Sequence, residues 1–273
     1  MKKIFWIILT LIFSLPSAAA GGDAAEMKLL NAADSAYKAG NYTLAVEAYD
    51  SVARTYGTSA ALYFNLANAW YEGGNIGMAR LYLERARKLA PGNSEIANNL
   101  EYVSMKIQDA NTADLKGKKG NIKPDEPNFW DGVTKTICAD RSSNYWAGFA
   151  VMSFLLLLAA VALYLFSTNI NARKVGFFGG LVFLFFAIVF IIFSFSAASY
   201  FESEDAGVIT AYKVELLTEP SPDSTPSSSP LNRGTKLEVM SVETAIGGKP
   251  AWYRVRLNRS NTGWVRAEDF ELI

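Results

Sequence analysis

Two long apolar segments dominate the pattern of hydrophobic and polar positions along the chain. Residues 145–166 and 175–198 contain no charged side chain. A helix of about 20 apolar residues crosses the roughly 30 Å hydrocarbon layer of a membrane, whereas a core helix of a soluble domain keeps a polar face. The pattern therefore predicts a membrane hairpin, with transmembrane helices over these two segments and a short loop over 167–174.

The amino terminus carries a shorter apolar run. Two lysines precede an apolar stretch over 4–15, and Ala18 and Ala20 follow it. A basic start, about a dozen apolar residues and an Ala-x-Ala pattern are typical of a secretory signal. We therefore expect residues 1–20 to be a cleaved signal peptide. The alternative, a retained membrane anchor, would need a longer apolar run.

Residues 24–111 show helical periodicity and an internal repeat. Four positions recur 34 residues apart: Gly40, Ala45, Tyr49 and Val52 return as Gly74, Ala79, Leu83 and Ala86. Small residues let two helices cross closely, and glycine permits the turn between them. The second copy, from LYFNLANAWYEGGN to RKLAPGN, resembles a tetratricopeptide repeat. One more amphipathic helix after it would make about two and a half repeats.

By this resemblance, the first helices of the repeats line a groove that binds peptides or partner helices. Some tetratricopeptide domains clamp a terminal carboxylate there with two asparagines and three basic residues. Asn65 matches one asparagine, but Asp34 replaces the other, and no basic residue stands at the three remaining positions, so this clamp is absent. The polar residues expected to face the groove are Asp34, Asn65, Asn68, Asn98, Asn99 and Tyr102. Simple solvation explains these residues equally well.

Residues 112–144 are predicted to be a linker followed by an interfacial helix. The linker is rich in lysine, glycine and proline, which favours a flexible tether; its lysines either touch anionic headgroups or only keep it solvated. Apolar side chains then fall near one helical face, which suits a short helix on the membrane surface: Phe129, Trp130, Val133 and Ile137. Cys138 follows as either an inert apolar residue or a redox-sensitive thiol.

Period-two alternation returns in residues 206–273. Strands are predicted around 236–239 and 252–257, with a proline- and serine-rich loop over 219–230. The succession of Gly-Thr, Trp-Tyr and Gly-Trp-Val motifs resembles a small all-β, bacterial SH3-like barrel. Four aromatic residues are candidates for a groove that stacks on extended peptides or glycans: Tyr212, Trp252, Tyr253 and Trp264. Alternatively, the two tryptophans fill the barrel core.

Composition narrows the possible chemistry. The chain has 26 acidic and 26 basic residues, so no net charge favours nucleic-acid binding. It contains no histidine, which excludes the commonest general base. Its single cysteine cannot form an internal disulfide or a thiolate zinc site. We therefore expect a non-enzymatic protein without a metal or cofactor.

A cleaved signal and a hairpin together place both soluble blocks on the exported side. The loop then lies in the cytoplasm, and its Arg173 and Lys174 agree with the preference of basic residues for that side. Gly176 and Gly180 have the GxxxG spacing that lets the two spans, or a partner's span, pack closely. The expected location is a bacterial inner membrane, multi-pass, with both domains on the periplasmic side.

The order of signal, tetratricopeptide array, hairpin and SH3-like domain resembles the BatE family of the Bat (Bacteroides aerotolerance) operon. The resemblance covers essentially the whole chain, and its most specific part runs from LYFNLANAWYEGGN to IANNLEYV. It implies a multidomain membrane protein encoded beside von Willebrand A domain proteins and a MoxR-type ATPase, and linked to aerotolerance or stress resistance. One hypothesis is a scaffold that holds partner proteins of this operon. The alternative is an envelope sensor or anchor whose SH3-like domain binds peptidoglycan.

Overall fold

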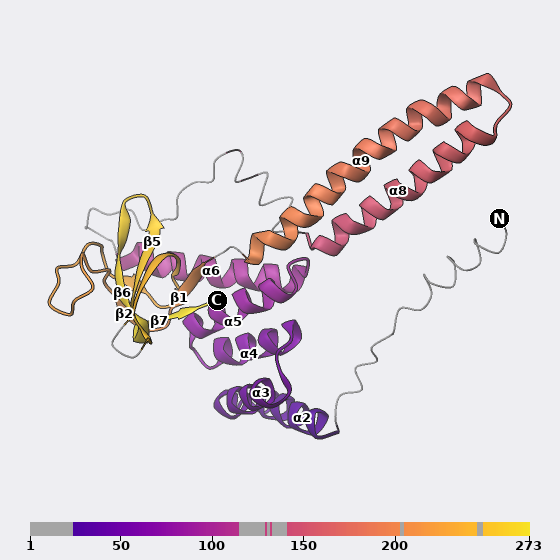
Figure 1. Ribbon diagram of the computed structural model, residues 1–273. Coiled ribbons are helices and arrows are strands. Elements are labelled where there is room, and N and C mark those ends of the chain that lie inside the picture. Colours follow the sequence, from indigo (N-terminus) through magenta and orange to yellow (C-terminus); the bar gives the residue numbers. More distant parts are fainter. Residues whose placement is uncertain (1–23, 115–128, 130–131, 133–140, 203–204, 245–247) are drawn as a thin grey trace.

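The structure is a computed structural model, and it describes residues 24–114, 129, 132, 141–202, 205–244 and 248–273. The expected signal peptide lies outside the described residues, as do Cys138 and most of the expected linker and interfacial helix. Within the described ranges, a block of helices, a long helical hairpin and a small β domain follow one another along the chain (Figure 1).

The helical block is built from successive antiparallel helices (Figure 1). Its helices are α2 (Ala24–Lys38), α3 (Tyr42–Tyr56), α4 (Ala60–Glu72), α5 (Ile76–Leu89) and α6 (Ser94–Asp114). Small residues of the repeat are fully buried, including Ala45 and Ala79. Because alanine has no side chain beyond Cβ, the helices approach closely at these points. Leu66 and Leu83 fill the space between them.

The same type of turn connects the two helices of each pair, α2 with α3 and α4 with α5. Gly40 and Gly74 have positive φ angles of 75° and 82°, a conformation that glycine adopts without steric cost. The side chains of Asn41 and Asn75 then accept hydrogen bonds from the backbone N–H groups three residues on, which caps the following helices. The sequence repeat is therefore also a structural repeat of helix, glycine turn, asparagine cap and helix.

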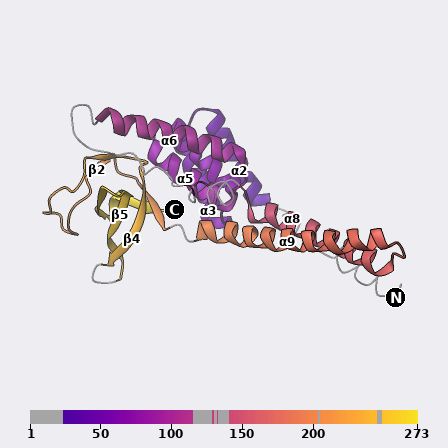
Figure 2. The ribbon, with the colours of Figure 1, turned by 90° about the horizontal axis from the view of Figure 1, so that it is seen from above.

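The two apolar segments form α8 (Ser143–Phe166) and α9 (Ile170–Glu202), which project together as one arm (Figures 1 and 2). Both helices are long and apolar enough to cross a membrane. The connection between them is only 167–169, shorter than the expected loop over 167–174. α9 begins early because the Asn169 side chain accepts a hydrogen bond from the backbone N–H of Asn171 at 2.8 Å and caps the helix.

The helices of the hairpin pack most closely at Gly176. A Cβ added there would lie 2.7 Å from the carbonyl oxygen of Ala160, and Gly180 faces the same alanine one turn further on. The GxxxG spacing therefore serves contact between the two helices of this chain. At the other end of the hairpin, Ser194 Oγ donates a hydrogen bond to the carbonyl of Ser143 at 3.1 Å.

The β domain contains a five-stranded antiparallel sheet with strand order β6-β5-β4-β1-β7, and a separate pair of β2 and β3. Its elements are β1 (Ala206–Ile209), β2 (Lys213–Val214), β3 (Leu231–Asn232), β4 (Lys236–Thr244), β5 (Pro250–Asn258), β6 (Asn261–Arg266), the 3-10 helix η2 (Ala267–Asp269) and β7 (Phe270–Leu272). Leu237, Val255 and Val265 point into its core. The strands predicted around 236–239 and 252–257 are confirmed.

The β domain packs directly against α5 and α6 (Figures 1 and 2). A Cβ added at Gly77 of α5 would lie 3.1 Å from the backbone nitrogen of Gly234. Asn111 of α6 is buried: its Nδ2 donates to Thr235 Oγ1 at 3.0 Å, and its Oδ1 accepts from the backbone N–H of Asn232 at 2.9 Å. Two blocks that the hairpin separates in sequence therefore form one packed unit.

A buried carboxylate lies at the same interface. Glu84 of α5 is only 4% exposed. Its side chain lies 3.3 Å from Lys236 Nζ, 3.0 Å from Arg87 and 3.7 Å from Arg80. Burial alone would raise the pKa of Glu84, but the three cations outweigh burial and lower it. Glu84 therefore stays ionised and joins α5 to β4.

Candidate functional site

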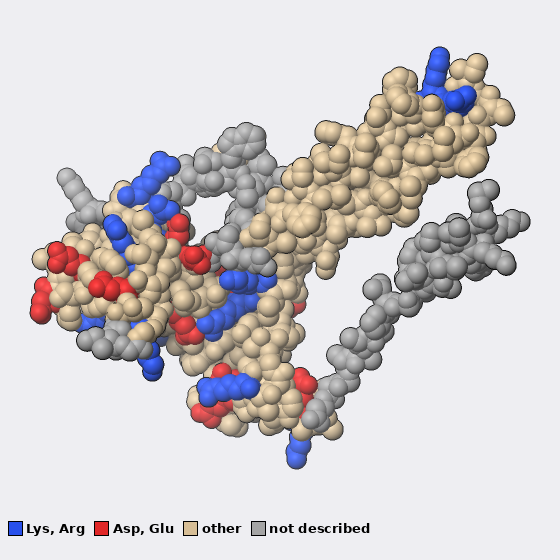
Figure 3. All heavy atoms as spheres, in the orientation of Figure 1, with Lys and Arg blue, Asp and Glu red and all other residues tan. Residues whose placement is uncertain are grey.

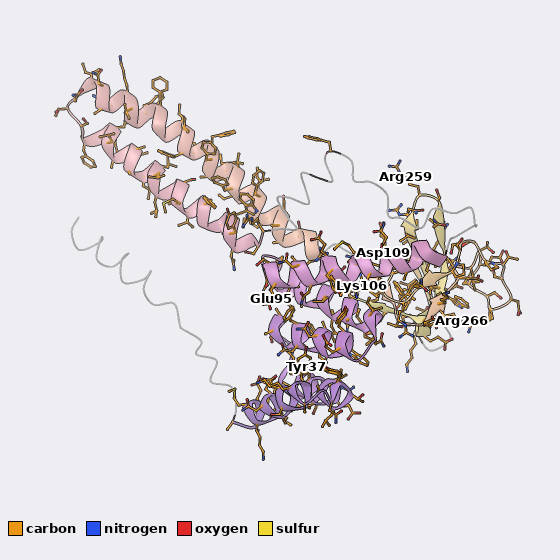
Figure 4. All side chains as sticks on the ribbon, turned by 180° about the vertical axis from the view of Figure 1, so that it is seen from behind. Tyr37, Glu95, Lys106, Asp109, Arg259 and Arg266 are labelled. Carbon is orange, nitrogen blue, oxygen red and sulfur yellow. The ribbon has the colours of Figure 1, made fainter. Side chains whose placement is uncertain are left out.

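Polar and aromatic side chains of α4 and α6 meet on one face of the helical block. Asn99 Nδ2 donates a hydrogen bond to Asn68 Oδ1 at 3.4 Å, and the Tyr71 hydroxyl donates to the Tyr102 hydroxyl at 3.3 Å. Lys106 Nζ lies 5.0 Å from the centre of the Tyr102 ring, and Figure 4 shows Lys106 partway along α6. These five residues are called the α4–α6 cluster below.

Hydrogen bonding within the α4–α6 cluster changes its acid–base properties. The hydrogen bond from Tyr71 is the main cause that lowers the pKa of Tyr102, and Lys106 adds to it. The pKa of Lys106 is raised, first by its hydrogen bond to Tyr102. Lys106 is therefore firmly cationic at neutral pH. A cation, two phenols and two amides on one face offer both hydrogen bonds and aromatic contacts to an extended peptide.

The structure brings three of the six expected groove residues together: Asn68, Asn99 and Tyr102 all belong to the α4–α6 cluster. Asn65 is half-buried on α4. Asp34 instead accepts a 2.5 Å hydrogen bond from the hydroxyl of Tyr49, a buried residue of α3. The Asp34 carboxylate therefore bonds to a side chain of the first helical pair. Asn98 lines a different cavity, between α5, α6 and β4.

The expected groove set omits Tyr71 and Lys106. Lys106 stands four residues after Tyr102, and Tyr71 stands three residues after Asn68. Side chains three and four residues apart on a helix lie on the same face. Helical spacing from Asn68 and Tyr102 is therefore the sequence signal that could have identified Tyr71 and Lys106.

The α4–α6 cluster continues onto the β domain through Lys106. A cavity of about 460 Å³ is lined by Lys106 and Ile107 of α6 together with Tyr212 and Arg233 of the β domain. Arg233 lies over the Tyr212 ring, 5.0 Å from its centre, and Tyr212 is 68% exposed. Both domains therefore contribute cationic and aromatic groups to one continuous surface.

The tryptophans of the β domain line a second cavity. Its volume is about 400 Å³, and Trp252 and Trp264 share its wall with Pro222 and Pro230. Both tryptophans are half-buried rather than buried in the core. Tyr253, expected as a groove aromatic, is 7% exposed and packs inside the domain against Phe270. Alternation along β5 explains this, because neighbouring side chains of a strand face opposite sides.

Among the described residues, no group of three or more His, Cys, Asp or Glu side chains is arranged to hold a metal ion. Comparison with known proteins gives no family assignment: no protein-family model matches the chain, and no curated protein matches it. The function is therefore argued from the geometry of the α4–α6 cluster and the surfaces beside it.

Proposed function

We propose that this chain is a non-enzymatic membrane scaffold of the BatE type, which binds partner proteins on the periplasmic side of a bacterial inner membrane. The hairpin anchors it, and the helical block is a tetratricopeptide array whose α4–α6 cluster holds a partner segment. The observation that carries the proposal is the continuous surface formed by this cluster and the β domain. A site built from two packed domains presents a fixed arrangement of groups to a partner, which reduces the entropic cost of binding.

The repeated turn supports the tetratricopeptide assignment. Gly40 and Gly74 share the same backbone conformation 34 residues apart, and each is followed by a capping asparagine. The SH3-like assignment is supported by the small antiparallel sheet, whose strands surround one hydrophobic core. The membrane assignment draws support from the two helices whose length and composition suit a bilayer.

The chemistry of the surface indicates the kind of partner. Lys106 and Arg233 supply positive charge, while Tyr102 and Tyr212 supply aromatic faces. An extended protein segment with acidic and apolar side chains complements such a surface. By the BatE resemblance, the partners are von Willebrand A domain proteins of the same operon, working with a MoxR-type ATPase in envelope stress or aerotolerance.

Partner co-purification tests this proposal. The full chain is purified in mild detergent from its native host, with Asn65→Ala and Asn99→Ala combined in one variant. Asn98→Ala is the matched control, because Asn98 lines a different cavity. The double variant should lose most of the co-purified partner, whereas the control should retain it. Equal partner recovery from all three proteins would contradict the groove assignment.

A second candidate function rests on the tryptophan cavity. Trp252 and Trp264 are accessible within it, and aromatic faces of this kind stack on sugar rings as well as on peptides. The corresponding function is an envelope sensor or anchor that binds peptidoglycan. The full chain should then sediment with purified cell wall, and Trp264→Ala should release it. Absence of sedimentation by the unaltered protein would remove this candidate.

A further inference from the structure

A cavity of about 400 Å³ lies at the far end of the hairpin, where α8 ends and α9 begins. Six residues line it: Tyr164, Ile170, Arg173, Lys174, Phe177 and Phe178. None of them belongs to the α4–α6 cluster or to the tryptophan cavity, so this is a separate site. Figures 1 and 2 show this end of the arm well away from the helical block and the β domain. It is called the tip cavity below.

The two cations of the tip cavity have no carboxylate beside them. The sequence contains no Asp or Glu from 141 to 201, and on the face seen in Figure 3 the tip of the arm carries Lys and Arg side chains without an acidic neighbour. The Arg173 guanidinium lies 5.2 Å from the centre of the Tyr164 ring, which is a neutral partner. The charges of Arg173 and Lys174 therefore add, and the tip cavity favours an anion.

Apolar side chains stand directly beside these cations. Phe177 is 49% exposed, Phe178 63% and Ile170 70%. Facing water, apolar surface of this extent is unfavourable, whereas in a bilayer it lies against acyl chains. The tip cavity therefore combines a cationic part with an apolar wall. A molecule that joins an anionic group to hydrocarbon chains complements both parts.

The length of the hairpin sets the depth of the tip cavity in a bilayer. α8 has 24 residues, so it is about 36 Å long at a rise of about 1.5 Å per residue. This slightly exceeds the roughly 30 Å hydrocarbon layer, so the ends of the hairpin reach the two headgroup regions. Arg173 and Lys174 lie near the start of α9, and their long side chains extend to the level of the lipid phosphates.

We propose that the tip cavity binds the phosphate group of an anionic phospholipid. Arg173 and Lys174 donate charged hydrogen bonds to the phosphate oxygens, and the acyl chains lie along Phe177 and Phe178. The same two cations repel the ammonium group of a zwitterionic headgroup, so the tip cavity selects a headgroup with net negative charge, such as that of phosphatidylglycerol. The inference rests on the membrane position of the hairpin in the proposed function.

Lipid binding by the full chain tests the inference. The protein is purified in detergent and examined by native mass spectrometry with equal amounts of phosphatidylglycerol and phosphatidylcholine, and separately with inorganic phosphate. One variant combines Arg173→Gln with Lys174→Gln, which removes both cations of the tip cavity. The matched control combines Lys28→Gln with Lys38→Gln, which removes the same charge from exposed positions of α2. Working in detergent separates lipid binding from any effect of the substitutions on membrane orientation.

The unaltered protein should retain phosphatidylglycerol in preference to phosphatidylcholine. The tip variant should bind phosphatidylglycerol about tenfold more weakly, while the α2 control binds it as the unaltered protein does. Thermal unfolding of each variant verifies that it is folded. Equal binding by the two variants, or no preference in the unaltered protein, would refute the site. If inorganic phosphate binding depends on the two cations and phosphatidylglycerol binding does not, the lipid source is refuted.

The membrane position itself is tested separately, by washing membranes that contain the unaltered chain with alkaline carbonate. Release of the chain would refute the membrane anchor of the proposed function, and with it the lipid as the source of the phosphate. Retention of the chain together with equal lipid binding by both variants would refute the tip cavity alone. Retention together with the expected loss in the tip variant supports both.

Discussion

Lys236 of the β domain reaches Glu84 of α5 at 3.3 Å, across an interface whose two sides are separated in sequence by the hairpin. Glu84 is 4% exposed and has two further cations beside it. Removing one member of a buried charge group takes a counter-charge away from the others, which is strongly destabilising. This contact therefore makes the packing of the two domains sensitive to single substitutions and to pH.

Glu84→Gln should destabilise the packed unit by about 3 kcal/mol, because three cations lose their buried counter-charge. Chemical denaturation of the full chain in detergent measures this. Glu101→Gln is the matched control, since Glu101 is an exposed residue on the neighbouring helix, and it should change the unfolding free energy by less than about 0.5 kcal/mol. Equal effects of the two variants would show that Glu84 contributes no special stabilisation.

The stability of the packed unit should also depend on pH through Glu84. Its pKa is lowered in the folded protein from an ordinary value of 4.5. The stabilisation is therefore fully present above pH 4.5 and is lost as the pH falls through the lowered folded pKa. Unfolding midpoints measured at decreasing pH should fall more steeply for the unaltered protein than for Glu84→Gln. Parallel pH profiles would contradict the ionised state of Glu84.

Gly77→Leu should separate the β domain from α5. Gly77 is buried, and a Cβ there would already lie 3.1 Å from the backbone of Gly234. The packing is measured by disulfide formation between cysteines that replace Asn111 and Thr235, with Cys138→Ser removing the native thiol. The two positions are close enough, because Nδ2 of Asn111 lies 3.0 Å from Oγ1 of Thr235. The disulfide should form readily in this parent protein and poorly after Gly77→Leu. Ala61→Leu, on the exposed surface of α4, is the control and should leave disulfide formation unchanged.

Gly176→Ala should loosen the hairpin, whereas Gly179→Ala should not. A Cβ at Gly176 would meet the backbone of Ala160 at 2.7 Å, but a Cβ at Gly179 would have only the Phe183 ring at 4.0 Å. Cysteines introduced by Ser143→Cys and Ser194→Cys, again with Cys138→Ser, report the contact of α8 with α9. If Gly176→Ala left the rate of disulfide formation unchanged, contact at Gly176 would not determine the packing of the hairpin.

Asp34→Ala should lower stability by about 1–2 kcal/mol, because the buried Tyr49 loses its hydrogen-bond acceptor. Burial and the hydrogen bond to Asp34 both raise the pKa of Tyr49, in agreement with a structural pair. The variant should retain partner proteins on co-purification as well as the unaltered chain does. Loss of partner from a protein that remains folded would assign Asp34 to the groove.

Local patterns in the sequence were sufficient to predict the repeated helical pairs, the two apolar helices and the strands β4 and β5. The glycine turns at Gly40 and Gly74 and the apolar runs of the hairpin follow from backbone conformation and hydrophobicity over short stretches. The boundary of α9 differed from expectation because the cap at Asn169 acts before the apolar run begins. Such capping depends on one side chain rather than on the average character of a segment.

The packing of the β domain on α5 and α6 could not be predicted in this way. It depends on contacts between residues more than 100 positions apart, such as Asn111 with Thr235. From the sequence alone, the buried Glu84 would be taken for an ordinary surface charge of an amphipathic helix. The same difficulty affects the site, because Asn98 and Asn99 are neighbours in sequence but face different cavities and partners.

The most direct test of the scaffold proposal is site-specific crosslinking in intact cells. A photoreactive amino acid replaces Tyr102, which is 48% exposed within the α4–α6 cluster, and in a control it replaces Met27, which is 53% exposed on α2. Adducts are identified by mass spectrometry. The proposal predicts that position 102 captures a von Willebrand A domain membrane protein and that position 27 does not. Recovery of the uncrosslinked chain alone, or of the same adducts from both positions, would contradict it.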